Sequence, residues 1–543
     1  MPLKRKKKAD RLKFYVGLLL GIVGFFLPIM LNFSGLSVAG HITLGIFLLA
    51  AVFWMFETIP IYSTSMLVIF LQIVLLSEQG LVYSDASLPK VRVKQQTAGS
   101  WMVPASAVDD DKIFIVENDQ NYKAADVEIV KRGDWFEVKS DEITSETKVV
   151  SNANHKLIGY NPVSFSTFLG TLASPIIILF LGGFMLAGAA VKYNLDRNLT
   201  NILLKPFGSK PMFIVLGLMM VTAILSAFMS NTATTAMMMT VAIPIAAQVA
   251  KDDKFRIMLA LSIPIAANIG GMATPIGTPP NAIVIANLSQ QDVSITFGSW
   301  IALMLPLVVL LLVLAWGAMR LLFPATVKEF KLSLEGKFNR SRPALILYTI
   351  FAITVLLWIT EAQHGIPGSM VAFLPIAGLT VTSVMKQDDI RSLPWEVLWL
   401  MAGGIALGIS MKNTGLAMWL VSSINWEVFP QVLLLLVFGF VALSLSNFLS
   451  NTVTATLLIP LAVSLGTSGV GGEGFSLIIT SLVIGAACNM AMLLPISTPP
   501  NAIAMSTGYI KTPDMVKVGI IIGMVGIVAA LILSQLYWPL IVN

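Results

Sequence analysis

The chain alternates long apolar stretches with short polar connections, and one long polar stretch interrupts this pattern. Several apolar stretches approach or exceed the roughly 20 residues that a membrane-spanning helix needs. Among them are residues 14–31, 42–56, 300–323, 344–359 and 518–542. Stretches of this length predict helical spans and not the strands of a barrel. We therefore expect an all-α polytopic membrane protein.

Composition supports this class, because 56% of the 543 residues are hydrophobic and only 12% are charged. The net charge of +6 comes largely from basic residues in short connections, as the positive-inside rule expects. The charge thus indicates orientation, not a nucleic-acid partner. A basic run at residues 4–8 precedes the first apolar stretch and predicts an uncleaved helix with a cytoplasmic start. The other basic connections are residues 192–210, 251–256, 328–342, 386–391 and 511–517. With all of these cytoplasmic, eleven spans plus two re-entrant hairpins place the C-terminus outside.

Candidate chemistry for an enzyme is sparse. The single cysteine, Cys488, excludes a disulfide framework. His41, His155 and His364 share no ligand spacing, so no histidine-based metal site is predicted. The sequence shows no nucleotide-binding loop and no nucleophile–base pair, so we expect that the protein is not an enzyme and has no cofactor.

Two polar motifs occur twice in the apolar regions. Ser230-Asn231-Thr232 returns as Ser450-Asn451-Thr452, and Thr278-Pro279-Pro280-Asn281 returns as Thr498-Pro499-Pro500-Asn501. Both pairs are displaced by 220 positions (450−230 and 498−278), which indicates an internal duplication. Polar clusters at membrane depth are costly and usually functional. In duplicated membrane proteins, such clusters mark a solute site where broken helices of two inverted repeats meet.

A second displacement locates an insertion in the first repeat. Trp54 and Glu57 return as Trp358 and Glu361, and Ser65 and Met66 as Ser369 and Met370, 304 positions later. The two displacements differ by 84 (304−220), so the first repeat has about that many extra residues between Met66 and Ser230. Composition places this insertion at residues 79–162. Alternation around residues 127–129 and 136–138 predicts strands. We expect a small β-rich domain, extracytoplasmic by the order of spans.

Residues 103–150 of this insert resemble the membrane-proximal β domain of periplasmic adaptor proteins. That resemblance implies a Gram-negative periplasm and an extracytoplasmic protein partner. The alternative is a passive loop domain.

The duplicated motifs predict helix breaks inside the membrane. A break leaves unpaired carbonyls on one side and unpaired amides on the other, which is tolerated only beside a polar cavity. Thr278 and Thr498 are expected N-caps, and Pro279 and Pro499 fit the first helical turn. Four helix N-termini facing one cavity would attract a small anion without a buried Lys or Arg. An anion channel or a transporter-like sensor would also be compatible with such a site.

At these motifs the chain resembles the divalent anion/sodium symporters of the ion-transporter superfamily, over nearly all of its length except residues 79–162. The resemblance implies a homodimer of eleven-span protomers in which a transport domain moves as an elevator against a scaffold. The implied parts are a basic tail (1–13), scaffold (14–78, 163–210 and 324–429) and transport domain (211–323 and 430–543). The implied hairpins are residues 211–250 and 430–468.

The resemblance also implies binding residues. Those for substrate are Asn231, Thr232, Thr278, Asn451, Thr452, Thr498 and Pro499. One sodium site would use Ser226, Ser230, Asn231 and Gly277, and the other would use Ser446, Leu449, Asn451 and Ser497. Leu449 and Gly277 would contribute backbone carbonyls.

The expected function is import of a small divalent anion, such as the C4-dicarboxylate succinate, across the inner (plasma) membrane, with sodium as the coupling ion. The alternatives within transport are sodium-independent dicarboxylate exchange and transport of sulfate or citrate.

Overall fold

The computed structural model describes most of the chain. Described are residues 2–31, 33, 36–84, 90–97, 100–104, 107–109, 112–116, 122–131, 135–150, 160, 162–250, 252–327, 329, 339–422, 430–467 and 476–542. His155, most of the basic connection 328–342 and the end of the predicted hairpin 430–468 lie outside these residues.

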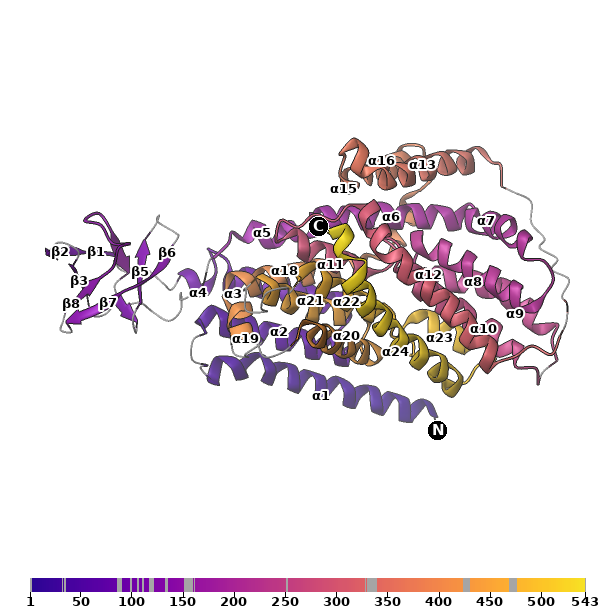
Figure 1. The fold of residues 1–543 in the computed structure, drawn as a ribbon, viewed down its shortest axis with the longest axis horizontal. Helices are drawn as coiled ribbons and strands as arrows, with labels where there is room; N and C mark the ends of the chain where they lie inside the picture. The colour runs from indigo at the N-terminus through magenta and orange to yellow at the C-terminus, as the bar shows by residue number, and fades with distance from the viewer. Residues whose placement is uncertain are drawn as a thin grey trace. The chain divides into compact units, whose positions relative to one another are not determined.

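The chain divides into two compact units, drawn as ribbons in Figure 1. The first comprises Met1–Gly170 and Ala406–Ile424, and the second comprises Thr171–Ile405 and Asn425–Asn543. The helices of the first unit are α1 (Pro2–Leu31), α2 (Val38–Phe56), α3 (Ile61–Leu76), α4 (Leu81–Ser84), α5 (Phe165–Gly170) and α19 (Leu416–Ser422). Helix α18 (Trp395–Asn413) runs from the second unit into the first.

In its described residues the second unit contains helices joined by turns and irregular segments. Its first part contains η2 (Thr171–Ala173), α6 (Pro175–Lys192), α7 (Leu195–Leu204), η3 (Lys205–Phe207), α8 (Pro211–Phe228), α9 (Asn231–Ala247), α10 (Phe255–Gly271), α11 (Pro279–Ser289) and α12 (Phe297–Leu322). The middle contains α13 (Arg342–Ile359), α14 (Glu361–His364), α15 (Gly368–Val371), α16 (Phe373–Val381) and α17 (Gln387–Arg391). The last part contains α20 (Gln431–Phe448), α21 (Asn451–Thr467), α22 (Leu477–Asn489), α23 (Pro499–Ser506), α24 (Thr512–Leu536) and α25 (Pro539–Val542).

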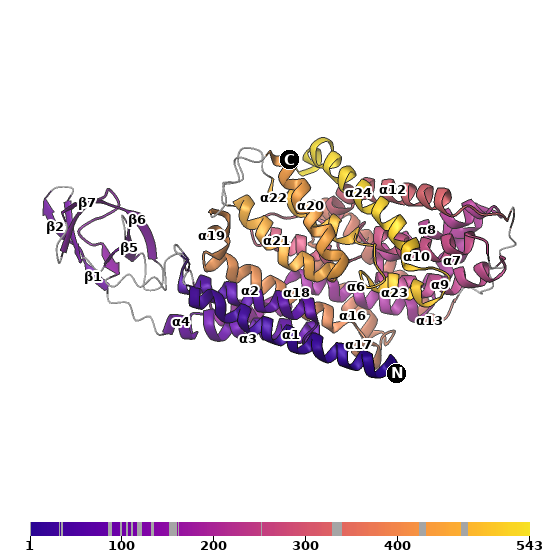
Figure 2. The ribbon, with the colours of Figure 1, turned by 90° about the horizontal axis from the view of Figure 1, so that it is seen from below.

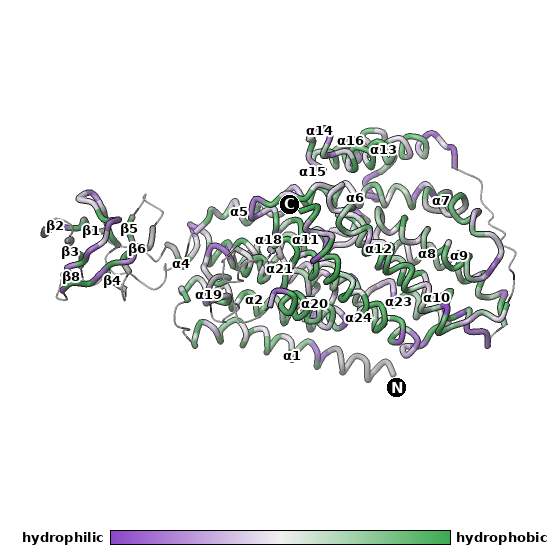
Figure 3. The backbone as a smooth tube through the Cα atoms, in the orientation of Figure 1, coloured by the Kyte–Doolittle hydropathy of each residue, from purple (hydrophilic) through white to green (hydrophobic). Residues whose placement is uncertain are grey.

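Eight helices of the described residues are long and apolar enough to cross a membrane, and five shorter apolar helices accompany them. Hydrophobic residues accordingly predominate along helices such as α12 and α24 in Figure 3. Length and composition confirm a multi-pass membrane protein. The number of eleven spans stays a prediction.

Two helix boundaries differ from the sequence-based expectation. Helix α1 begins at Pro2, so the basic run at residues 4–8 is part of the first helix and not a separate tail. The apolar stretch 518–542 was expected to be one helix, but α24 ends at Leu536 and α25 begins at Pro539. Proline lacks an amide hydrogen and disfavours helical backbone in the residue before it, which explains the interruption.

The two glutamates of the 304-residue displacement have structural partners. The Glu361 carboxylate accepts hydrogen bonds from the backbone amides of Phe297 (2.9 Å) and Gly368 (3.0 Å), so it joins the starts of α12 and α15. Glu57 follows α2 in a left-handed conformation and pairs with Lys13 at 3.1 Å. Both glutamates therefore hold helix ends in place.

The described residues between positions 90 and 150 contain antiparallel strands in two sheets. One sheet has the order β1-β9-β5-β4 with β6 also paired to β5, and the other has the order β2-β3-β8-β7. The strands are β1 (Lys90–Arg92), β2 (Lys94–Thr97), β3 (Ser100–Pro104), β4 (Val108–Asp109), β5 (Lys112–Val116), β6 (Tyr122–Asp126), β7 (Glu128–Lys131), β8 (Trp135–Lys139) and β9 (Lys148–Val150). The alternation at residues 127–129 and 136–138 thus coincides with β7 and β8.

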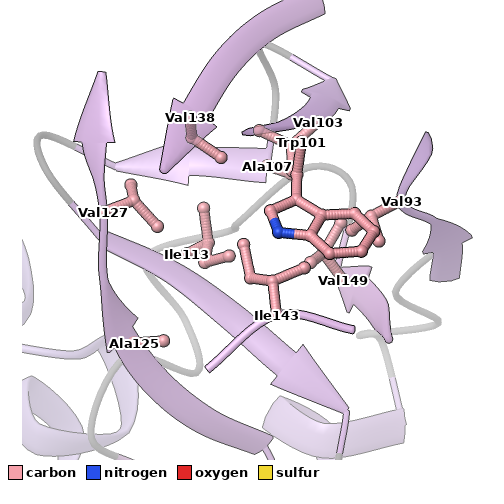
Figure 4. Packing of buried hydrophobic residues seen from close by; sticks show 10 residues of the cluster. All are labelled: Val93, Trp101, Val103, Ala107, Ile113, Ala125, Val127, Val138, Ile143 and Val149. Atoms are coloured by element: carbon pink, nitrogen blue, oxygen red, sulfur yellow. The ribbon is translucent and has the colours of Figure 1, made fainter. Parts of the chain in front are cut away.

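The two sheets share one apolar core, shown in Figure 4. Val103, Ile113, Val138 and Val149 are fully buried in it, and Trp101 covers one side. Every residue of this core lies between positions 93 and 149, so the insert has a hydrophobic core of its own.

The two ends of the insert meet. The Glu78 amide donates to the Val163 carbonyl at 2.9 Å, and the Tyr160 hydroxyl donates to the Leu76 carbonyl at the end of α3. The insert therefore leaves and rejoins the helical part of its unit at one place.

Substitution Val138→Ala should loosen the insert, because it removes two methyl groups from a fully buried position at a cost of roughly 2 kcal/mol. Val130→Ala is a matched control, since Val130 lies on β7 and is 47% exposed. In the full chain, trypsin should cleave the insert about 30-fold faster in Val138→Ala, given about 1.4 kcal/mol per tenfold, and at the wild-type rate in Val130→Ala. Equal rates in the two variants would contradict the core assignment.

Candidate functional site

Each Ser-Asn-Thr motif lies at a break between two helices, as predicted. Helix α8 ends at Phe228 and α9 starts at Asn231, while α20 ends at Phe448 and α21 starts at Asn451. The intervening Met229 and Leu449 have extended backbones.

The serine of each motif caps the second helix of its pair. Ser230 Oγ accepts from the Ala233 amide at 3.3 Å, and Ser450 Oγ accepts from the Val453 amide at 3.2 Å. Ser230, expected to ligate sodium, thus uses its side chain as an N-cap here.

The Thr-Pro-Pro-Asn motifs start α11 and α23, and Pro279 and Pro499 occupy the first helical position as predicted. Thr498 caps its helix by accepting from the Asn501 amide at 3.4 Å. Thr278 also occupies the N-cap position, as predicted, but its side chain makes no cap hydrogen bond. Its hydroxyl donates to Asn489 Oδ1 at 3.1 Å, because Asn489 reaches it from the second repeat.

The asparagines of these motifs hold the unwound segments that precede them. Asn281 Nδ2 donates to the carbonyls of Gly271 (3.0 Å) and Thr274 (2.7 Å). Asn501 Nδ2 donates to the Leu494 carbonyl at 3.0 Å. Each of these amides is buried and replaces hydrogen bonds that the broken helix has lost.

Helices of the first repeat pack against helices of the second repeat. Helix α9 packs against α23 (Figure 2), and α11 packs against α21, so each Ser-Asn-Thr helix contacts the Thr-Pro-Pro-Asn helix of the other repeat.

Two buried asparagines join the repeats by side-chain hydrogen bonds. Asn268 Nδ2, on α10, lies 3.1 Å from Thr498 Oγ1 and 3.5 Å from Asn501 Oδ1. Reciprocally, Asn489 on α22 accepts from Thr278, and its Nδ2 donates to Asn281 Oδ1 at 3.1 Å. The site is therefore one connected polar structure and not two separate ones.

The first predicted ion site gathers oxygen atoms around Asn231. One atom of the Asn231 side-chain amide lies 2.6 Å from Ser226 Oγ and 3.3 Å from the carbonyl oxygens of Ala267 and Gly277. Ser226 Oγ also lies 2.8 Å from the Ala267 carbonyl. Ser226, Asn231 and Gly277 thus converge as predicted, and the Ala267 carbonyl joins them.

The second predicted ion site is assembled in part. Ser446 Oγ lies 2.8 Å from Asn451 Oδ1 and 3.0 Å from the Cys488 carbonyl, which repeats the arrangement around Ser226. Ser497 instead donates to the backbone carbonyl of Asn447 at 3.0 Å. The Leu449 carbonyl follows the end of α20, with the Leu449 amide bonded to Leu445.

The predicted substrate residues differ in exposure. Thr232 and Pro499 are exposed and Thr452 is half-buried, whereas Thr278 and Thr498 are each 4% exposed. The latter two carry hydroxyls that are bonded within the protein. Within the described ranges, no group of three or more His, Cys, Asp or Glu side chains is placed to hold a metal ion.

Sequence reasoning missed Asn268 and Asn489, although both are polar residues in apolar helices. They are displaced by 221 positions (489−268), one more than the motifs, so a search at the motif displacement does not pair them. The carbonyls of Ala267 and Cys488 leave no side-chain signal at all.

Substitution Asn281→Ala should lower the free energy of unfolding, because the Gly271 and Thr274 carbonyls lose their hydrogen-bond donor at a cost of about 1–3 kcal/mol each. Asn287→Ala on the same helix is the matched control, since the Asn287 amide bonds only the Ile283 carbonyl one turn back. We expect a clearly lower thermal unfolding midpoint in detergent for Asn281→Ala than for Asn287→Ala. Similar midpoints would show that Asn281 does not support the break.

Comparison with known proteins gives a consistent family. The model of the citrate transporter family matches residues 156–485, which is 330 of 543 residues (485−156+1). An uncharacterized transporter of Haemophilus influenzae is 35% identical over 69% of this chain and 84% of its own.

Two further relatives carry functional names. The sodium-dependent high-affinity dicarboxylate transporter 3 of Caenorhabditis elegans is 30% identical over 66% of this chain and 73% of its own. The sodium-dependent dicarboxylate transporter SdcS of Staphylococcus saprophyticus is 31% identical over 70% of this chain and 79% of its own. The chain thus belongs to the citrate transporter family, among the divalent anion/sodium symporters of the ion-transporter superfamily, and is a membrane transporter and not an enzyme.

Proposed function

We propose that this protein is a sodium-coupled symporter that imports a small divalent anion, most simply a C4-dicarboxylate such as succinate. The names of the relatives in Caenorhabditis elegans and Staphylococcus saprophyticus support both the ion and the substrate class.

The observation that carries the sodium assignment is the convergence of Ser226 Oγ and the Ala267 and Gly277 carbonyl oxygens on the Asn231 amide, which holds in either orientation of that amide. The single hydroxyl hydrogen of Ser226 serves either Asn231 Oδ1 at 2.6 Å or the Ala267 carbonyl at 2.8 Å, but not both. With the amide oxygen of Asn231 facing inward, it also lies 3.3 Å from the Gly277 carbonyl. In this orientation the oxygens outnumber the available hydrogens and repel one another unless a cation lies among them, whereas in the opposite orientation the Asn231 nitrogen supplies the missing hydrogens. Such oxygen ligands suit a hard cation.

The same shortage of hydrogens occurs in the second repeat, where Ser446 faces both Asn451 Oδ1 and the Cys488 carbonyl. Two sites of this kind support a stoichiometry of more than one sodium ion per cycle.

The helix starts supply the field for the anion. The N-termini of α9, α11, α21 and α23 carry fractional positive charge from their aligned peptide dipoles. Such sites bind carboxylates without a buried Lys or Arg. A site built from partial charges also releases its ligand readily, as a transporter requires.

Sodium should bind first and offset the cost of bringing a dianion into the membrane. Each net positive charge that enters with the anion adds ~2.3 kcal/mol per 100 mV of membrane potential. At ~1.4 kcal/mol per tenfold, this corresponds to about 50-fold accumulation.

The proposal includes the expected architecture: eleven spans, re-entrant hairpins at residues 211–250 and 430–468, and a homodimer working as an elevator. It also includes a cytoplasmic N-terminus, with the C-terminus and the insert outside the plasma membrane. Since Glu78 and Val163 are adjacent, joining them directly deletes the insert with little disturbance. If the insert serves a protein partner, this deletion should abolish the partner's copurification and leave uptake intact.

Uptake of labelled succinate by proteoliposomes tests the function. We expect an inward sodium gradient to drive accumulation and current, and Asn231→Ala to abolish both. Unchanged uptake after replacement of sodium by choline would refute sodium coupling. Uptake only into succinate-preloaded vesicles would instead identify an exchanger.

Substitution Gly271→Ala should weaken sodium binding selectively. A Cβ at Gly271 would lie 2.5 Å from the Asn231 amide and push it from the oxygen cluster. Loss of one ligand of a charged group, at about 1–3 kcal/mol, should raise the sodium concentration for half-maximal uptake by roughly 5- to 150-fold. Gly317→Ala on α12 has open space and should behave as wild type. A normal sodium dependence in Gly271→Ala would remove Asn231 from the ion site.

Citrate is the second candidate substrate, since the matching family model is that of citrate transporters. Competition of unlabelled succinate, citrate and sulfate against labelled succinate distinguishes the candidates. Stronger inhibition by citrate than by succinate would reassign the substrate within the same site.

A further inference from the structure

Asn268 lies between the first ion site and the start of α23. It is 1% exposed, and its Oδ1 lies 3.5 Å from Asn231 Nδ2. Its Nδ2 faces Thr498 Oγ1 at 3.1 Å. Asn268 therefore connects an ion-binding amide of the first repeat to the helix start that faces substrate in the second repeat.

Its counterpart Asn489 is connected differently. Asn489 Nδ2 donates to Asn281 Oδ1 and to the Gly485 carbonyl one turn back on its own helix, at 3.1 and 3.0 Å. Its Oδ1 accepts from Thr278. The Asn489 amide thus donates one of its hydrogens to its own helix, whereas the Asn268 side chain faces the Asn231 amide. The two repeats thus have the same residue types at these positions but different hydrogen-bond partners.

The orientation of the Asn231 amide determines what Asn268 can do. When the Asn231 oxygen faces the oxygen cluster, the Asn231 nitrogen faces Asn268 and donates to Asn268 Oδ1. Asn268 Nδ2 then donates to Thr498 Oγ1, which also accepts from the Asn501 amide. Both acceptor positions of the Thr498 hydroxyl are occupied, so its hydrogen is left for a ligand.

Without a cation, the opposite amide orientation is favoured. The Asn231 nitrogen then donates to Ser226 Oγ at 2.6 Å and to the Ala267 and Gly277 carbonyls at 3.3 Å. The Asn231 oxygen now faces Asn268 Oδ1, and two oxygens repel. If the Asn268 amide turns in response, its oxygen faces Thr498 and accepts the hydrogen of the Thr498 hydroxyl. That hydrogen is then withheld from a ligand.

We propose that Asn268 is a positioning residue that relays sodium binding at Asn231 to the Thr498 hydroxyl by reversing the direction of its hydrogen bonds. The relay rests on the proposed sodium-coupled function and connects the proposed ion site to the proposed substrate site. Sodium selects the chain of bonds in which Thr498 donates to a substrate carboxylate. By thermodynamic reciprocity, the dianion raises sodium affinity by the same factor.

The test is a double titration of the purified full chain with succinate and sodium. Succinate affinity is measured in choline and in saturating sodium, and sodium affinity is measured without succinate. Allosteric coupling is typically ~5- to 150-fold, and we expect at least about tenfold for the wild type.

Substitution Asn268→Ala should reduce the coupling factor to less than about threefold, within the scatter expected of an uncoupled pair, while sodium affinity without succinate stays within about threefold of wild type. Asn268→Leu, of similar volume, serves if the alanine variant does not fold. A residue that only supports the fold would change the two affinities without changing their ratio.

Asn489→Ala is the matched control, because it removes the reciprocal hydrogen bonds to Thr278 and Asn281. It should weaken succinate binding equally with and without sodium and keep the coupling factor. Wild-type coupling in Asn268→Ala or Asn268→Leu, or equal loss in Asn489→Ala, would overturn the relay alone. Absence of coupling in the wild type would overturn the sodium-coupled function and the relay with it.

Discussion

The hydrogen-bonding needs of broken helices govern the second unit of this protein. Each break leaves backbone amides and carbonyls without their helical partners, and these groups need other partners at membrane depth. Side-chain amides and hydroxyls meet part of that need, as Asn281 does for the Gly271 and Thr274 carbonyls and Ser230 does for the first turn of α9. Polar groups near the same breaks are the ones that we expect a solute to contact. The segments that need stabilising hydrogen bonds are therefore also the segments proposed to bind.

The exchange of partners between repeats follows from the same need. Each repeat pairs only some of the polar groups at its breaks, since Asn268 bonds to Thr498 and Asn489 bonds to Thr278 across the duplication. The packing of α9 on α23 and of α11 on α21 extends this dependence to whole helices. A half-protein would leave buried polar groups without partners, which is costly in an apolar medium.

The sequence predicted the breaks and the helix starts at Pro279 and Pro499, because these features depend on local residue types and a repeated spacing. The convergence of Ser226 with Asn231 was implied by the family resemblance. The sequence did not predict that Thr278 bonds to Asn489 and not to its own helix, because that depends on how two distant segments pack. Nor did it identify the carbonyls of Ala267 and Cys488, since any residue has a carbonyl and only the fold directs it. The end of α24 at Leu536 was readable from Pro539, but the apolar run concealed it.

The closeness of Glu78 and Val163 has a consequence for how the chain acquired its β-rich segment. From the viewpoint of the helices, the segment of residues 79–162 is equivalent to a tight turn, because its ends are as close as those of a hairpin. The entropy of closing a loop grows only slowly with loop length, and a folded insert carries most of that cost itself. Evolution could therefore add, exchange or remove such a domain at this point while the membrane part kept its structure.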